Sequence, residues 1–110
     1  MELQSKKYLD DILNAIQLIE EFLVETRSFV AYSYDKKTSS AVERQLGIIG
    51  EAVNNYDKLN QNDPLKNTIQ IVGLRNRIIH AYDSIDDTII WAIIHKHLPE
   101  LKKEVKQKLG

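Results

Sequence analysis

Residues 9–23 read LDDILNAIQLIEEFL, and this stretch shows the pattern that decides the fold. Its apolar residues recur every three or four positions, while acidic and amide residues occupy the positions between them. That spacing matches the turn of an α-helix with one apolar face. It predicts a first helix from Gln4 to Thr26, with its apolar stripe at Leu9, Ile12, Ile16, Ile19 and Leu23.

The same periodicity continues along the chain with little to interrupt it. Four Gly and two Pro are few helix breakers for 110 residues, which favours a small number of long helices. Residues 27–37 form a connection that packs its aromatic rings against the bundle, with or without a short helical turn. A second helix carries the apolar repeat over residues 42–56. It begins after Ser40, whose spacing to Glu43 matches a capping box, or earlier, at Asp35.

Further helices follow a polar loop. Residues 63–64 are an Asp and a Pro, a pair typical of a helix start, and they predict a third helix that runs to about Ala81. Residues 86–88 can cap a fourth helix. Pro99 either kinks this helix or begins a short last one. The sequence therefore predicts an all-α, antiparallel bundle of four to five helices, with residues 1–110 as one domain.

Composition excludes several classes of protein. Apolar residues make up 43% of the chain and charged residues 28%, as in a folded globular protein, and the net charge is −1. That charge excludes the strong positive field of a dedicated nucleic-acid binder, so any RNA contact is local and no DNA partner is expected. The chain has no Cys, which excludes thiol nucleophiles and Cys-zinc sites. No apolar run approaches the ~18 residues of a membrane span. The first residues lead into an amphipathic pattern rather than an apolar stretch with a small-residue cleavage site, so we expect a cytoplasmic protein.

Two glycines lie inside the predicted second helix. Gly47 and Gly50 each cost about 1 kcal/mol relative to Ala at a helical position. Close approach of another backbone usually offsets such a cost. We therefore expect a tight helix–helix contact here, either within the chain or across a dimer.

The most unusual segment is GLRNRIIHAY, residues 73–82. Arg75, Asn76 and His80 are costly to bury unless they are paired, yet they lie in an apolar helix. On a regular helix Asn76 and His80 are about 40° apart, whereas Arg75 and His80 are about 140° apart. Three arrangements bring Arg75 and His80 together: the long arginine sweeps round the helix, the helix distorts, or a second copy of the chain shares the site.

This segment resembles the Arg-x4-His-x-Tyr signature of the HepT-like toxins, which belong to the HEPN superfamily of helical ribonucleases. Arg75, His80 and Tyr82 match its three positions. The similarity extends upstream to LGIIGEAV at residues 46–53 and downstream to Ile85-Asp86, Trp91 and LPEL at residues 98–101. One difference is the absence of the tryptophan that many relatives place before the Gly-x-Arg-Asn turn.

The resemblance implies a metal-independent endoribonuclease that acts as a homodimer, with two motif segments facing each other across a cleft. His80 is then the base, because an imidazole can accept the 2′-hydroxyl proton near neutral pH. Arg75 holds the phosphate with its planar fork, and Asn76 orients His80 or the phosphate. No metal and no cofactor are expected.

The resemblance also implies regulation. Many HepT-like toxins form type VII toxin–antitoxin systems with a minimal nucleotidyltransferase, which adenylylates the tyrosine of the motif. Tyr82 is that position. A bulky, anionic adduct there blocks RNA by its size and by charge repulsion.

Other interpretations stay open. A HEPN-like module without catalysis can bind a nucleotide or a nucleotidyltransferase, and a histidine phosphotransfer bundle is a weaker rival. Glu51 can pair with Arg75 across the bundle in a structural role. Arg77 is either a solvated side chain or part of the phosphate site. His95 and His97 point to different sides of their helix, so we interpret them as surface or packing residues rather than metal ligands.

Overall fold

The computed structural model describes the backbone of residues 1–80 and 86–110 and the side chains of residues 1–78 and 86–110. All regular structure in these residues is helical, which confirms the all-α prediction. None of the helices so described is both long and apolar enough to cross a membrane. The helices are α1 (Leu3–Phe22), α2 (Phe29–Tyr34), α3 (Lys36–Leu59), α4 (Ile69–His80), α5 (Asp87–Lys96) and α6 (Leu98–Leu109).

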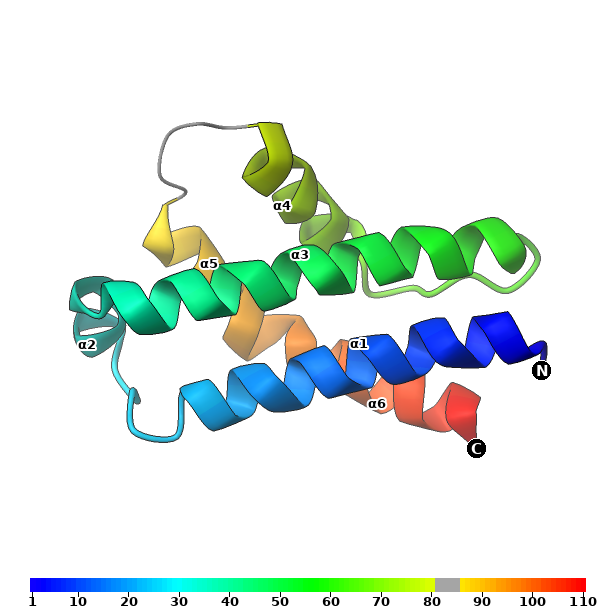
Figure 1. Cartoon of the computed structure of the whole chain (residues 1–110), viewed down its shortest axis with the longest axis horizontal. Coiled ribbons are helices and arrows are strands. Elements are labelled where there is room, and N and C mark those ends of the chain that lie inside the picture. Colours follow the sequence, from blue (N-terminus) through cyan, green and yellow to red (C-terminus); the bar gives the residue numbers. More distant parts are fainter. Residues whose placement is uncertain (81–85) are drawn as a thin grey trace.

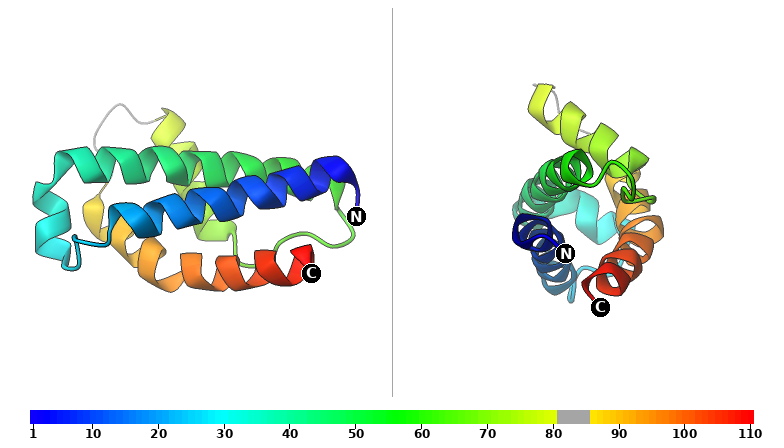
Figure 2. Two further views of the ribbon diagram at one scale, coloured as in Figure 1. Left: turned by 60° about the horizontal axis from the view of Figure 1, so that its bottom comes forward. Right: turned by 90° about the vertical axis from the view of Figure 1, so that its right-hand side faces the viewer.

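Two long helices form the centre of the bundle. α1 and α3 run antiparallel along the long axis, and α5 and α6 pack behind them (Figure 1). α4 contacts α3 but leans away from the rest of the bundle, as the end-on view in Figure 2 shows. Four of the five residues predicted for the apolar stripe of the first helix are buried, whereas Leu23 lies beyond the end of α1 and is partly buried. The core includes Leu9, Ile12, Ile16, Ile19, Leu46, Ile49, Val53, Ile71 and Ile90.

The first helix is shorter than predicted. It ends at Phe22 rather than Thr26 because the chain tightens into turns, in which the Val24 amide bonds to the Glu21 carbonyl and the Thr26 amide to the Leu23 carbonyl. Ser28 then caps α2 by accepting a hydrogen bond from the Ala31 amide at 3.1 Å. The connection at residues 27–37 thus contains a short helix.

The second predicted helix is α3, and of its two candidate starts Asp35 is the one used. The Asp35 carboxylate accepts hydrogen bonds from the Thr38 amide at 3.0 Å and from the Thr38 hydroxyl at 2.6 Å. These two bonds lower the pKa of Asp35. Ser40 lies inside the helix, so the capping-box start at Ser40 was wrong.

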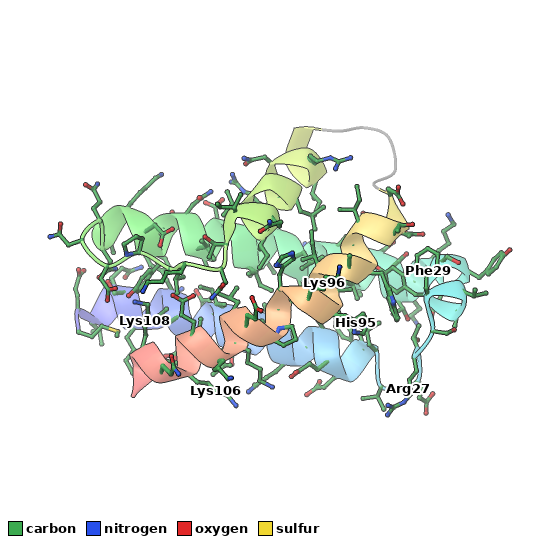
Figure 3. The ribbon with its side chains drawn as sticks, turned by 180° about the vertical axis from the view of Figure 1, so that it is seen from behind. Arg27, Phe29, His95, Lys96, Lys106 and Lys108 are labelled. Atoms are coloured by element: carbon green, nitrogen blue, oxygen red, sulfur yellow. The ribbon has the colours of Figure 1, made fainter. Side chains whose placement is uncertain are left out.

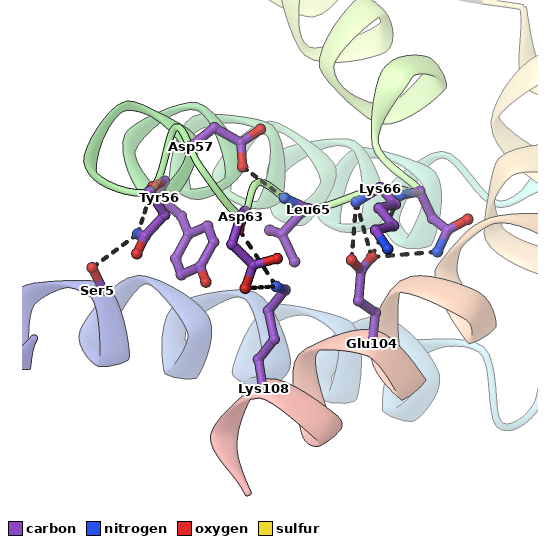
Figure 4. A network of polar contacts seen from close by, with 10 residues as sticks. Ser5, Tyr56, Asp57, Asp63, Leu65, Lys66, Glu104 and Lys108 are labelled. Atoms are coloured by element: carbon purple, nitrogen blue, oxygen red, sulfur yellow. Dashed lines mark hydrogen bonds and ion pairs between the residues drawn. The ribbon is translucent and has the colours of Figure 1, made fainter. Parts of the chain in front are cut away.

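The prediction that a helix begins at residues 63–64 was also wrong, because α4 begins at Ile69. The Asp63 carboxylate caps no helix and instead pairs with the Lys108 ammonium of α6 at 3.0 Å. Polar side chains from other helices hold the loop that precedes α4 (Figure 4). The loop contacts join Asn60 to Ser5, Leu65 to Asp57, and Lys66 and Asn67 to Glu104.

The last two helices begin where the sequence indicates. Asp86 caps α5 by accepting a hydrogen bond from the Thr88 amide at 2.8 Å. Pro99 lies in the first turn of α6, where the lack of an amide hydrogen costs no helical bond. Of the two interpretations of Pro99, the start of a last helix is therefore confirmed.

Candidate functional site

Arg75 lies at the contact between α3 and α4, directly over Gly50. A Cβ atom placed on Gly50 would lie 2.7 Å from the Arg75 Cγ atom and nearer still to its Cβ atom. Only glycine therefore lets the two helices approach this closely at residue 50. The expected tight contact exists within the chain for Gly50, whereas a Cβ atom on Gly47 would meet nothing within 4 Å.

The Arg75 guanidinium is held from two sides. Its Nη2 atom donates to the Glu51 carboxylate of α3 in an ion pair, and its Nη1 atom donates to the Asn76 Oδ1 atom at 3.1 Å. The predicted pairing of Glu51 with Arg75 is confirmed. These two bonds fix the guanidinium in place. Because the Arg75 side chain is 22% exposed, it still reaches solvent.

An open groove of about 610 Å³ runs past this guanidinium between α1, α3 and α4. Its charged lining residues are the basic Lys7, Arg44 and Arg75 and the acidic Asp11, Glu43 and Glu51. The Lys7 ammonium is paired with the Asp11 carboxylate at 2.8 Å, whereas Arg44 forms no ion pair with any residue whose side chain is described. The groove can therefore present Arg44 and the outer edge of Arg75 to an anionic ligand.

Asn76 has a more specific partner than the sequence indicated. Its side chain accepts a hydrogen bond from Arg75, which lies next to it in the chain, and it thereby orients the guanidinium. Its predicted action on His80 or on a phosphate stays a prediction. His80 ends α4, but its side chain and Tyr82 lie outside the described residues, so the relation of Arg75 to His80 is also a prediction still.

Sequence reasoning missed a second group of interacting side chains, at the other end of α3. The Tyr32 ring is completely buried, and that burial, together with the charges of Asp87 and Glu43, raises its pKa. Burial and the Asp87 charge also raise the pKa of Glu43. Trp91 covers Tyr32, with ring centroids 5.2 Å apart, and His95 packs on Trp91 at 4.3 Å. Residues 27–37 have no sustained apolar period, so the sequence gave no signal of these charged neighbours.

The described residues offer no group of three or more His, Cys, Asp or Glu side chains that could hold a metal ion. His95 packs on an aromatic ring, and His97 lines a pocket between α4 and α5. The polar side chains in the described part of α4 are those of Gln70, Arg75, Asn76 and Arg77.

Comparison with known proteins gives a consistent result. A family model described as Ribonuclease HepT-like matches residues 12–107. The chain is 39% identical to the "Probable ribonuclease HepT" of Thermococcus cleftensis, over 93% of each chain. It is 37% identical to a "Putative RNase" of Caldanaerobacter subterraneus, over 94% of this chain and 93% of the relative. A third relative, a "Putative RNase" of Methanocaldococcus jannaschii, is 36% identical over 92% of this chain and 93% of its own length. No solved structure matches the chain.

Proposed function

This chain belongs to the HepT-like ribonuclease family, and we propose that it is an endoribonuclease that cuts RNA without a metal ion. The observation that carries the proposal is the Arg75 guanidinium, fixed by Glu51 and Asn76 at the edge of an open groove. A preorganised cation of this kind stabilises charge that builds up on a phosphate in the transition state. The same helix ends in His80, which supplies the base.

The reaction needs one base, one cation and one acid. His80 takes the proton of the RNA 2′-hydroxyl, and the 2′-oxygen then attacks the adjacent phosphorus. Arg75 binds the phosphate oxygens with its planar fork while the bond to the 5′-oxygen breaks. A second imidazole donates a proton to that leaving oxygen. The products are a fragment with a 2′,3′-cyclic phosphate and a fragment with a free 5′-hydroxyl.

The second imidazole comes from a second copy of the chain in our proposal. α4 packs on α3 and projects from the bundle, so its outer face is available to another protomer (Figure 2). Asn76 on that helix is exposed. A homodimer through this region brings two copies of Arg75 and His80 to one cleft.

We further propose that the chain is the toxin of a type VII toxin–antitoxin system that acts in the cytoplasm. A partner nucleotidyltransferase then switches it off by adenylylating Tyr82. The test is to incubate the protein with that partner and ATP and to measure its mass. The proposal requires one added AMP on the wild type and none on Tyr82→Phe. Equal modification of both proteins contradicts it.

The ribonuclease proposal is tested by the rate at which purified protein cleaves a labelled single-stranded RNA in EDTA. We expect cleavage by the wild type and a loss of at least about 100-fold in His80→Ala, the size of a general-base contribution. Arg75→Ala should lose a similar factor. Full activity in both variants would refute the site, and a wild type that binds RNA without cutting it would favour a non-catalytic module.

A further inference from the structure

A second concave site lies between α4 and α5. It is a pocket of about 410 Å³, within the range of roughly 300–1,000 Å³ that small-ligand pockets occupy. Leu74, Ile89 and Ile93 form its apolar walls, and Gln70, Arg77 and His97 are its polar lining residues. Neither the resemblance nor the proposed mechanism uses these three polar side chains.

The pocket and the Arg75 groove lie on different faces of α4. Gln70, Leu74 and Arg77 are spaced at four and three residues, so they share the face turned to α5. Arg75 and Ile78 line the other groove, beside α3. One helix thus presents a phosphate-binding guanidinium on one side and an apolar pocket with polar edges on the other.

The positive charge of Arg77 at the edge of the pocket favours an anionic ligand. None of the lining residues is acidic among those the structure describes, and Arg77 has no ion-pair partner within the described side chains. Lys96 follows Ile89 and Ile93 at helical spacing, so it extends the same face of α5, which crosses the front of the view in Figure 3. A ligand with a flat apolar part and a neighbouring negative charge fits this combination.

We propose that the α4–α5 pocket holds one unpaired base of the RNA substrate, with Gln70 bonded to the base edge and Arg77 to the adjoining phosphate. Proteins bind single-stranded RNA by packing unstacked bases on aromatic rings or guanidinium planes and by bonding to their exposed edges. A Gln amide carries both a donor and an acceptor for a base edge. This inference rests on the proposed ribonuclease function, because it assigns that enzyme a subsite beside its cutting residues.

Gly73 offers a way to fill the pocket without disturbing the fold. It lines the pocket, and a Cβ atom at this position would meet nothing within 4 Å. Leu is also a better helix former than Gly. Gly73→Leu therefore occupies the space of the base. Arg77→Ala removes the guanidinium and leaves Gln70 in place, and Arg27→Ala, an exposed arginine outside this pocket, is its matched control.

The experiment measures binding rather than cleavage. Fluorescence anisotropy gives the affinity of each protein for short 2′-O-methyl RNAs, which cannot react through their 2′-oxygen, with one base removed at each position in turn. We expect wild-type protein to bind about tenfold more weakly when one particular base is missing, a change of about 1.4 kcal/mol. Gly73→Leu should bind the intact RNA about tenfold more weakly than wild type does. Its affinity should not change when that base is removed. Arg77→Ala should weaken all of the RNAs, and Arg27→Ala should match the wild type.

Two results overturn the inference. One is equal sensitivity to the missing base in wild type and Gly73→Leu. The other is a change in oligomeric state in Gly73→Leu with unchanged RNA affinity, which assigns the pocket to a protein partner. If the protein cuts RNA but gives either of these results, the subsite proposal is refuted and the ribonuclease proposal stands. If the protein shows the expected binding pattern but does not cut RNA, only the ribonuclease proposal is refuted.

Discussion

Gly50 and Arg75 fit each other at the point where α4 meets α3. We predict that Gly50→Ala lowers the free energy of unfolding by about 1–3 kcal/mol, because its methyl group would overlap the Arg75 side chain. RNA cleavage should fall as well, since Arg75 must move. Gly47→Ala is the matched control on the same helix, where the added methyl group meets nothing within 4 Å. It should stabilise the protein by up to about 1 kcal/mol. Equal effects of the two substitutions in chemical unfolding would contradict this packing argument.

Glu51 is a positioning residue for Arg75 in our account. We predict that Glu51→Ala lowers the rate of RNA cleavage about tenfold, because the guanidinium loses one of its two anchors. The free energy of unfolding should change by less than about 1 kcal/mol, since the Glu51 side chain is 53% exposed. Cleavage rate and urea unfolding, measured on the same preparations, check the two parts. A large loss of stability would instead make Glu51 a purely structural residue.

The pairing of Glu51 with Arg75 could be predicted at the level of residues, because an arginine in an apolar helix needs a partner. The orientation of Asn76 toward Arg75 could not. Adjacent residues on a helix do not face each other, so no spacing rule brings Asn76 to its neighbour. The length of the arginine side chain makes that contact.

At the scale of elements, Asp86 and Asp63 show why one predicted helix start succeeded and another failed. Asp86 caps α5 through an amide two residues away, and the sequence carries that information. Asp63 looks like a cap in the sequence, but Lys108 of α6 pairs with it. The amides of Leu65 and Lys66, between Asp63 and α4, bond to the carboxylates of Asp57 and Glu104. These bonds hold the chain in a loop up to Ile69. No periodicity reveals such long-range contacts.

Glu104 accepts more hydrogen bonds from this loop than any other described residue. Its carboxylate accepts from the Lys66 amide at 3.0 Å and from the Asn67 amide and side chain. We predict that Glu104→Ala destabilises the protein by about 1 kcal/mol and speeds hydrogen exchange at the Lys66 and Asn67 amides. Glu100→Ala, one turn earlier on α6, is the control for exchange at these two amides and should leave it unchanged. Unchanged exchange in Glu104→Ala would show that the loop holds itself.

Asp57 adds a pH dependence to the same loop. Burial raises the pKa of Asp57, and the Glu104 charge adds to the effect, while the hydrogen bond from the Leu65 amide opposes it. A raised pKa favours the protonated acid in the folded state. The contribution of Asp57 to stability is therefore full below the ordinary pKa of 3.8 and is lost as pH rises through the raised value.

Asp57→Asn keeps an oxygen acceptor for the Leu65 amide and carries no charge. We predict that its free energy of unfolding, relative to wild type, increases as the pH rises from about 3 to about 7. Urea unfolding at a series of pH values measures this difference. A difference that stays constant across the range would mean that the ionised Asp57 carries no penalty in the folded protein.

At the scale of the whole molecule, α4 packs mainly on α3 and projects from the bundle (Figure 2), and it carries Arg75, Asn76 and His80. That placement suits a site completed by a second copy. We predict that sedimentation equilibrium gives a mass twice the 12.7 kDa of one chain. A monomer at micromolar concentration would leave each His80 without the partner imidazole that the reaction needs.

The most direct measurement of the central claim is mass spectrometry of the products from one RNA of defined sequence, incubated with the protein in EDTA. The proposed mechanism yields fragments that end in a 2′,3′-cyclic phosphate, and no cut where the nucleotide before the scissile bond is 2′-deoxy. Fragments that end in a 3′-hydroxyl, or cutting that ignores the missing 2′-hydroxyl, would contradict it.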